Sequence, residues 1–439
     1  MTYSDGEPVK ASDFAYTIKR AIKVESAAKG FLTPYIQGAE AYEAGQAKSI
    51  SGIVTDDKTG KITIKLTQAY GSFANVLGLP NLGLVPSGTP MTNLAQDPPP
   101  GVGPYMITAV DAEGGYTLKQ NPRFACLHIA GIPTGYANKI NLQVVPNEEV
   151  EAQKVLHNEA DVFDTADLVP SEMVPQIEAA AAGRYSLTAS ASTYFFFLNT
   201  TRAPFNNLKA RQAVNTALDR GKLAELSGNT ITPDCFFLPK GIVGHPNTPC
   251  PFGSTPDVAK AKQLVQESGT AGTPVEIWIQ AEGPRRAYGD YYTQMLNEIG
   301  FKATEHPVAN GEYWETVNDQ TNDPQTGFGD WFQDFPNPAD FYFLLDGRTL
   351  QPGNSNFNLS QVNDPVLQEK LIPLSEAPAT ILNGSTAGWE ALETYVSNQA
   401  YVAPFGEQGV PKFFSNRIDY ARAVTHVGFG NDFTSLRLK

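Results

Sequence analysis

Three aspartates lie among aromatic residues in one short stretch, residues 327–345, which reads GFGDWFQDFPNPADFYFLL. These acids are Asp330, Asp334 and Asp340. Most aspartates lie on solvated surfaces and need no aromatic neighbours. Asp334 follows Trp331 by three positions, and Pro336 and Pro338 then exclude a helix and favour an extended loop or turn. A carboxylate on such a loop, walled by large apolar side chains, suits the capture of an ammonium group in a partly dry cleft.

Two other interpretations of this stretch stay open. The first is a strand at the edge of the core, Phe328 to Phe332, that enters an ordinary surface turn. The second is a glycoside or peptide hydrolase, in which Asp334 forms an acid/base pair with Asp330 or Asp340. No Ser–His or Cys–His pair stands in a recognisable catalytic motif, so binding is favoured over catalysis.

Composition and charge limit the kinds of partner. The chain has 439 residues, 41% hydrophobic and 18% charged, which is typical of a globular protein with two or three domains. Its 32 basic and 46 acidic residues give a net charge of −14, which argues against nucleic acid or anionic lipid as a partner. No apolar stretch approaches the ~20 residues needed to span a bilayer. The polar opening, MTYSDGEPVKASDF, carries no signal peptide, so we expect either a trimmed form or an export signal upstream.

The three cysteines predict one disulfide. Cys235 and Cys250 bracket a loop rich in Pro and Gly, and a bridge between them would stabilise the fold by about 3 kcal/mol in the chain-entropy description. Two buried free thiols are the alternative. His245 is isolated and a fourth ligand is missing, so no metal site is predicted. A disulfide would indicate an oxidising compartment, and Cys126 would be free or paired with a segment outside this sequence.

The first third of the chain predicts an α+β unit with an antiparallel sheet. Ser12 is expected to cap a helix whose apolar residues recur at helical spacing. Strands are expected over residues 50–54 and 62–66, joined by a turn. A hairpin is expected over residues 105–110 and 116–120.

Two later segments predict parallel β-α-β units. The first comprises a strand over residues 140–145, a helix over 148–158 and a strand over 161–163. The second comprises a strand at 275–280, a helix at 287–299 and a strand at 301–306. Further helices are expected over 209–226, 258–267, 365–374 and 387–398. Residues 194–199 predict a wholly buried central strand, and the tail, 413–439, predicts one or two returning strands.

Five segments, spread almost end to end, carry a recognisable signature. They are YSDGEPVKASDFAYTIKRA, GVGPYMI with LKQNPRF, INLQVVPNEEVEAQKVLHNEADVFD, FFFLNTTRAPFNNLKARQAVNTALDR and GDWFQDFPNPADFYFLL. Each is weak by itself, but in this order and spacing they resemble the family 5 extracellular solute-binding proteins of ABC importers. That family is the oligopeptide-, dipeptide- and nickel-binding group.

The resemblance implies a fold and a function. The fold is α/β, periplasmic-binding-protein-like type II, with two α/β lobes, a hinge and an extra α+β domain. The extra domain would span residues 1–138, lobe one 139–203 and 404–439, and lobe two 204–403. The function would be capture of a small solute, an oligopeptide or dipeptide, by a monomer that serves a membrane permease without a cofactor. A sugar, an opine or a metal chelate is the alternative solute, and the location would be extracytoplasmic with a lipid anchor in the full-length form.

The resemblance also implies site residues. Asp334 stands where peptide-binding relatives pair an aspartate with the peptide amine, and Trp331 would form the adjoining wall. Main-chain groups of Gly329 and Trp331 would bond an extended ligand, and Tyr35 resembles a cleft tyrosine, with packing as its alternative role. The family begins several tens of residues earlier, so we expect lobe one to be incomplete in this sequence.

Overall fold

The computed structural model describes residues 1–129, 131–145, 147–164, 169–170, 172–350, 356–426, 428 and 430–439. The chain divides into two compact units. The first contains Met1–Asp164, Ala181–Tyr185 and Lys412–Lys439, and the second contains Thr165–Ala180 and Ser186–Pro411. No helix in the described residues is long and apolar enough to cross a membrane.

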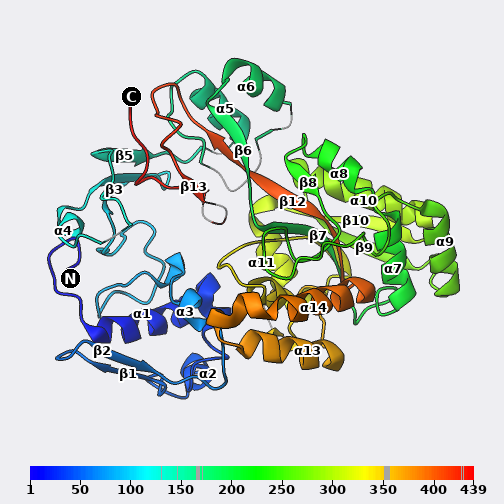
Figure 1. The fold of residues 1–439 in the computed structure, drawn as a ribbon, viewed down its shortest axis with the longest axis horizontal. Helices are drawn as coiled ribbons and strands as arrows, with labels where there is room; N and C mark the ends of the chain where they lie inside the picture. Colours follow the sequence, from blue (N-terminus) through cyan, green and yellow to red (C-terminus); the bar gives the residue numbers. More distant parts are fainter. Residues whose placement is uncertain are drawn as a thin grey trace. The chain divides into compact units, whose positions relative to one another are not determined.

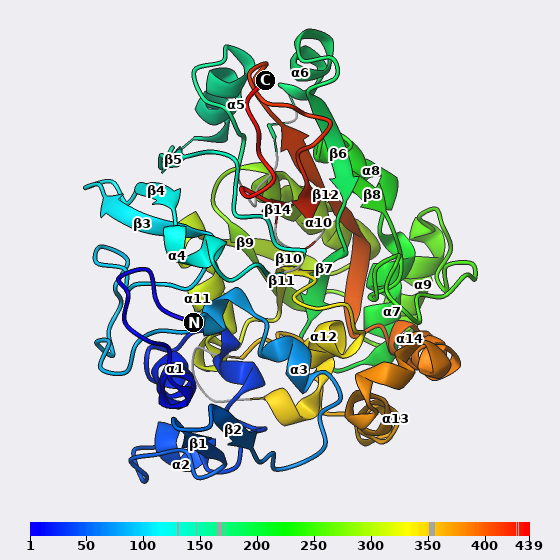
Figure 2. The ribbon, with the colours of Figure 1, turned by 60° about the vertical axis from the view of Figure 1, so that its left-hand side comes forward.

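Small antiparallel sheets and short helices build the first unit. Helix α1 packs on the hairpin of β1 and β2, all drawn in blue in Figure 2. A second sheet has the order β3-β4-β5, and β13 pairs with β14 near the C-terminus. The elements are α1 (Ala11–Lys23), α2 (Ala39–Glu43), β1 (Ile53–Asp56), β2 (Lys61–Ile64), α3 (Phe73–Val76), β3 (Tyr105–Val110), β4 (Tyr116–Gln120), α4 (Pro122–Ala125), β5 (Lys139–Leu142), α5 (Glu148–Leu156), β13 (Thr425–His426), β14 (Gly430–Asn431) and the 3-10 helices Ala27–Phe31 and Pro80–Leu82.

Two local predictions for this unit are wrong. The N-cap of α1 is Lys10, not Ser12, because the Asp13 carboxylate accepts the Lys10 amide at 2.9 Å, while the Ser12 hydroxyl bonds Asp57. The first β-α-β is not parallel, because β5 pairs antiparallel with β4 and Val162 forms an antiparallel bridge with the tail. Both predicted hairpins are confirmed.

A seven-stranded mixed sheet forms the core of the second unit. Its order is β10-β9-β11-β7-β12-β6, with β8 paired to β12. Strand β7 is buried at every residue, as its run of aromatic residues predicts, and it lies between β11 and β12. The predicted parallel β-α-β is confirmed, because β9 and β10 pair in parallel and α10 packs on both.

Helices surround this sheet, and α13 and α14 lie side by side, drawn in orange in Figure 1. The strands are β6 (Tyr185–Ala189), β7 (Ser192–Leu198), β8 (Ile231–Pro233), β9 (Pro274–Gln280), β10 (Lys302–Val308), β11 (Thr326–Phe332) and β12 (Val402–Phe413). The helices are α6 (Val174–Ala180), α7 (Leu208–Ala217), α8 (Arg220–Leu226), α9 (Val258–Glu267), α10 (Pro284–Ile299), α11 (Tyr313–Asn318), α12 (Ala339–Tyr342), α13 (Pro365–Glu376) and α14 (Thr386–Gln399), with 3-10 helices at Asn310–Glu312, Gln320–Asn322, Phe343–Leu345, Gly347–Thr349 and Ala379–Ser385.

The compact units and the predicted three-part division have different bounds. Strand β7, assigned in that division to lobe one, pairs with β11, assigned to lobe two. Strands β6 and β12 each contain a point where the chain passes from one unit to the other. The division into an extra domain and two lobes remains a prediction.

The predicted disulfide is confirmed. Cys235 and Cys250 are joined, and the Cα atoms of the pair lie 5.8 Å apart. Cys126 is exposed and has no disulfide partner in the described part of the chain.

Candidate functional site

A buried carboxylate organises the loop that follows β11. Asp340 is fully buried, and it accepts hydrogen bonds from the amides of Asp334 at 2.7 Å and Phe335 at 3.3 Å. Its other oxygen accepts the Trp331 indole N–H at 3.3 Å. Burial, with the neighbouring charge of Asp334, raises the pKa of Asp340. One acid therefore ties the strand end, the loop and α12 together.

Asp334 differs from the other two acids of the motif. Within the described residues its carboxylate has no hydrogen-bond or ion-pair partner, although the side chain is half-buried. Burial raises the pKa of Asp334 to about 6. An ionised acid in such a place is partly dehydrated and has no counter-ion among the described residues, so a cationic ligand group would stabilise its charge.

Asp330 is neutralised by Arg285. The Arg285 Nη2 atom lies 3.0 Å from Asp330 Oδ2, and both side chains are largely buried. The guanidinium lies over the rings of Phe328, at 5.1 Å, and Trp314, at 5.8 Å. Within the described residues Asp330 therefore has a counter-ion and Asp334 has none.

Sheet topology brings these groups to one edge. Strands β9 and β11 run parallel, so their carboxyl ends meet at the same edge of the sheet. Arg285 lies in the first turn of α10, just after β9, and Asp334 lies just after β11. Ligands of α/β sheets bind in the crevice outside the carboxyl ends of the strands.

The main-chain groups of β11 alternate between two edges. Gln325 O accepts the Asn199 amide and the Gln333 amide donates to Ala191 O, so odd-numbered residues face β7. The main-chain groups of Gly329 and Trp331 therefore face β7 and are unsuited to the ligand bonding predicted for them. The opposite edge, to which Phe332 belongs, is where an added strand would bond.

Strands β9 and β11 separate beyond the first residues of β11. They pair only at Thr326 and Gly327 in the described structure. The buried Tyr313 hydroxyl lies at this point, shared between Trp278 O at 3.1 Å and Phe328 O at 2.8 Å. Past it, no described strand pairs with the outer edge of β11.

The other predicted site residues make packing contacts, and the ligand roles of Trp331 and Tyr35 stay predictions. A Cβ atom on Gly329 would lie 2.6 Å from the Phe195 ring, so this glycine allows the ring to cross β11. Trp331 is half-buried and its ring meets that of Phe357 edge-on at 5.7 Å. Tyr35 belongs to the first unit, where it is buried and stacks on Tyr70 at 4.3 Å. The structure thus brings Asp334, Trp331 and Gly329 together and places Tyr35 in the other unit.

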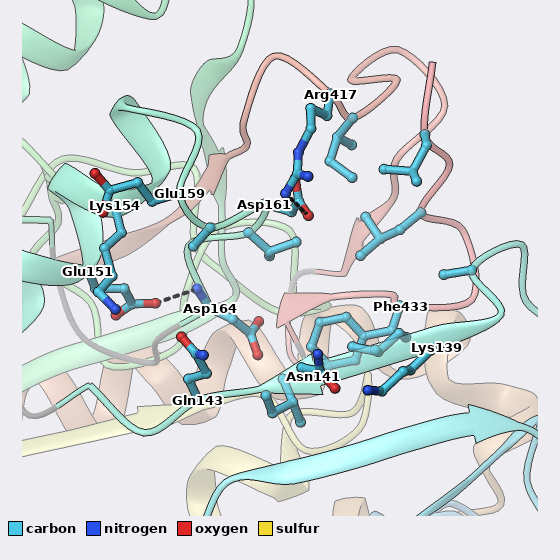
Figure 3. Close-up of a pocket in the computed structure, with 18 of the residues that line it drawn as sticks. Lys139, Asn141, Gln143, Glu151, Lys154, Glu159, Asp161, Asp164, Arg417 and Phe433 are labelled. Carbon is cyan, nitrogen blue, oxygen red and sulfur yellow. Dashed lines mark hydrogen bonds and ion pairs between the residues drawn. The ribbon is translucent and has the colours of Figure 1, made fainter.

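A cavity of about 390 Å³ lies in the first unit and contains none of the predicted site residues (Figure 3). It is lined by β5, the end of α5 and the C-terminal tail. Arg417 points to Asp161, with Nη2 2.7 Å from Oδ2, and Glu151 accepts the Asp164 amide at 2.8 Å. Burial raises the pKa values of Glu151 and Asp164. Sequence reasoning missed this cavity because its walls come from residues 137–164 and from the C-terminal tail, which are far apart in the sequence.

Comparison with known proteins identifies the family. Residues 1–351 match the model of the bacterial extracellular solute-binding proteins, family 5 Middle. This match covers most of the sequence, so the chain belongs to that family, as its motifs predict.

Individual relatives are distant. The dipeptide-binding protein DppE of Bacillus subtilis (strain 168) is 26% identical over 281 residues, which cover 60% of this chain and 49% of DppE. The probable deoxycholate-binding periplasmic protein YgiS of Escherichia coli (strain K12) is 24% identical over 286 residues, 61% of this chain and 50% of YgiS. The chain therefore spans about half the length of these curated relatives.

A solved structure confirms the fold. Clavulanic acid biosynthesis oligopeptide binding protein 2 superposes with a TM-score of 0.86 at 19% identity, over 100% of this chain and 82% of that one. At this identity the likeness supports the type II periplasmic-binding-protein fold and no finer property.

Proposed function

We propose that this chain is the solute-binding component of an ABC importer and that it captures a peptide through the peptide's N-terminal amine. The observation that carries the proposal is Asp334, a half-buried carboxylate that has no counter-ion among the described residues. It lies beside Trp331, at the carboxyl edge of a parallel β-α-β unit. A charge-assisted hydrogen bond to an ammonium contributes about 1.5–3 kcal/mol there.

The main chain of β11 supports the same ligand class. Its outer edge past Gly327 has no described strand partner, and Phe332 belongs to this edge. An extended peptide can pair with such an edge as an added strand, which gives affinity with little side-chain selectivity. The amine would then lie at the end of β11, where Asp334 follows.

The charge of the loop discriminates between the ligands named for the relatives. DppE is named for dipeptides and YgiS for deoxycholate, which has a carboxylate and no amine. An anionic ligand at Asp334 would place two like charges in a partly dry site. Peptides, which carry an ammonium group, therefore fit this loop better than bile acids.

The acid/base alternative fits the geometry poorly. Asp340 is fully buried and bonded to three donors, and Asp330 is paired with Arg285. Neither acid is placed to share a proton with a substrate beside Asp334. A monomer that serves a membrane permease outside the cytoplasm, anchored by lipid in its full-length form, completes the proposal.

Calorimetry with a tripeptide and its N-acetylated form tests the amine anchor. We expect acetylation to weaken binding by about tenfold or more, because it removes the charge that Asp334 meets. Asp334→Asn should weaken binding of the free peptide by a similar factor and leave the acetylated peptide unaffected.

Asp290→Asn is the matched control, since Asp290 is an exposed acid of the same unit that pairs with Arg286 along a helix. It should change neither affinity. Equal affinity for free and acetylated peptide in the wild-type protein would overturn the amine anchor. Native mass spectrometry of the purified protein would identify any ligand carried from the cell.

A further inference from the structure

Two buried carboxylates and a histidine converge in the second unit, away from the loop after β11. They are Asp234, His245 and Glu407, and one ligand atom of each lies within 4.8 Å of those of the other two. His245 Nε2 lies 3.1 Å from Asp234 Oδ2. Sequence reasoning treated His245 as isolated, because Glu407 reaches it only through the pairing of β12 with β8.

The fold holds these groups in place. Asp234 Oδ1 accepts the amides of Cys235 at 2.6 Å and Phe236 at 3.1 Å, which turns Oδ2 towards His245. Glu407 accepts the Lys240 amide at 2.6 Å. The Cys235–Cys250 disulfide closes the loop that begins next to Asp234 and carries His245. These side chains therefore need little movement to meet at one point.

Two cations interact with the Asp234 carboxylate of this cluster. Asp234 and Glu407 are each 8% exposed. Lys240 Nζ lies 3.3 Å from Asp234 Oδ2, and the buried Arg220 interacts with the same carboxylate through its charge. Buried carboxylates in proteins are paired with cations or coordinate metal ions.

We propose that Asp234 Oδ2, His245 Nε2 and the Glu407 carboxylate bind one divalent metal ion, with zinc preferred. Zinc takes imidazole nitrogen and carboxylate oxygen, and tetrahedral ligands lie about 3.4 Å apart at the usual bond lengths. The Asp234–His245 spacing of 3.1 Å is close to that value. Three protein ligands leave the fourth position for water.

Lys240 is the competitor for this site. Its ammonium lies where the metal would neutralise Asp234, but its side chain is 53% exposed and can swing into solvent. Zinc binding therefore exchanges a lysine for a metal ion at Asp234. The zinc affinity should therefore depend on residue 240, whereas a cluster with a purely structural role would show no such dependence.

Titration calorimetry of EDTA-treated protein with zinc chloride at pH 7.5 tests the proposal. We expect one zinc ion per chain. His245→Gln and Glu407→Gln should each weaken zinc binding by about tenfold or more, because each removes a proposed metal ligand. His306→Gln is the matched control, since His306 lies 3.4 Å from Glu276 in an exposed pair, and it should leave the affinity unchanged.

Lys240→Met separates metal binding from folding damage. It should tighten zinc binding several-fold, because the competing ammonium is gone, and a misfolded variant would not gain affinity. No zinc uptake by the wild-type protein, equal uptake by His245→Gln, or weaker uptake by Lys240→Met would each overturn the proposal. Anomalous diffraction at the zinc edge would place the ion.

Discussion

The amine anchor proposed at Asp334 should make ligand affinity depend on pH, because this carboxylate has no ion-pair partner among the described residues. Burial raises the pKa of this group to about 6, and below that pH it is neutral and cannot pair with an ammonium. We expect peptide affinity to fall by up to about tenfold per pH unit below pH 6, as one proton competes with one amine. Calorimetry from pH 7.5 to 4.5 measures this, and a flat profile in the wild-type protein would contradict it.

The same carboxyl affects the stability of the unliganded protein. Its pKa is higher in the folded than in the unfolded chain, so the folded state binds the proton more tightly. The contribution of this group to the free energy of unfolding therefore falls as pH rises from about 4 to about 6. Asp334→Asn should be more stable than the wild type at pH 7 and equal to it at pH 4 in urea titrations. A difference that is the same at both pH values would show that burial of the charge is not its cause.

Asp340 should matter for stability more than any other acid of the motif. Asp340→Ala removes the acceptor of three hydrogen bonds and leaves an empty space where the carboxylate was. We expect a loss of about 3 kcal/mol in the free energy of unfolding. Asp290→Ala removes an exposed acid of the same unit and serves as the control in urea denaturation. A loss below about 1 kcal/mol would mean that the loop is organised without this carboxylate.

At the scale of elements, β11 depends on a close approach between a glycine and a ring. Gly329→Ala should cost about 1–3 kcal/mol, because its new methyl would overlap Phe195 on the paired strand. Gly311→Ala is the matched control, since a Cβ there meets nothing within 4 Å. Thermal unfolding of both variants measures the difference, and equal melting temperatures would mean that the Phe195 ring simply moves.

Sequence patterns predicted the elements whose cause is local. The hairpin of β3 and β4 follows from a turn between alternating runs, and β9-α10-β10 follows from periodicity ended by Gly300. The parallel interpretation of β5 failed because strand pairing is not local, and a half-buried edge strand has the same residues as a buried one. The free carboxylate of Asp334 could be expected from its neighbours, but the Arg285–Asp330 pair needed the strand order.

At the scale of the whole molecule, the net charge of −14 should affect how fast ligands arrive. We expect the association rate of a lysine-containing peptide to fall by about tenfold between low and high salt, because a negative surface steers cations. A neutral peptide of the same length should change much less, and dissociation rates should hardly change. Stopped-flow fluorescence of Trp331 and its neighbours measures both, and equal salt dependence for the two peptides would contradict steering.

The Tyr313 hydroxyl lies between two neighbouring strands of the second unit. The hydroxyl of Tyr313 sits in the fork between β9 and β11 and occupies carbonyl groups of both. Past this hydroxyl, the described residues of β9 and β11 do not pair. In the described structure the outer edge of β11 past Gly327 therefore has no strand partner, and under the proposed function an extended peptide would form the missing strand beside Asp334.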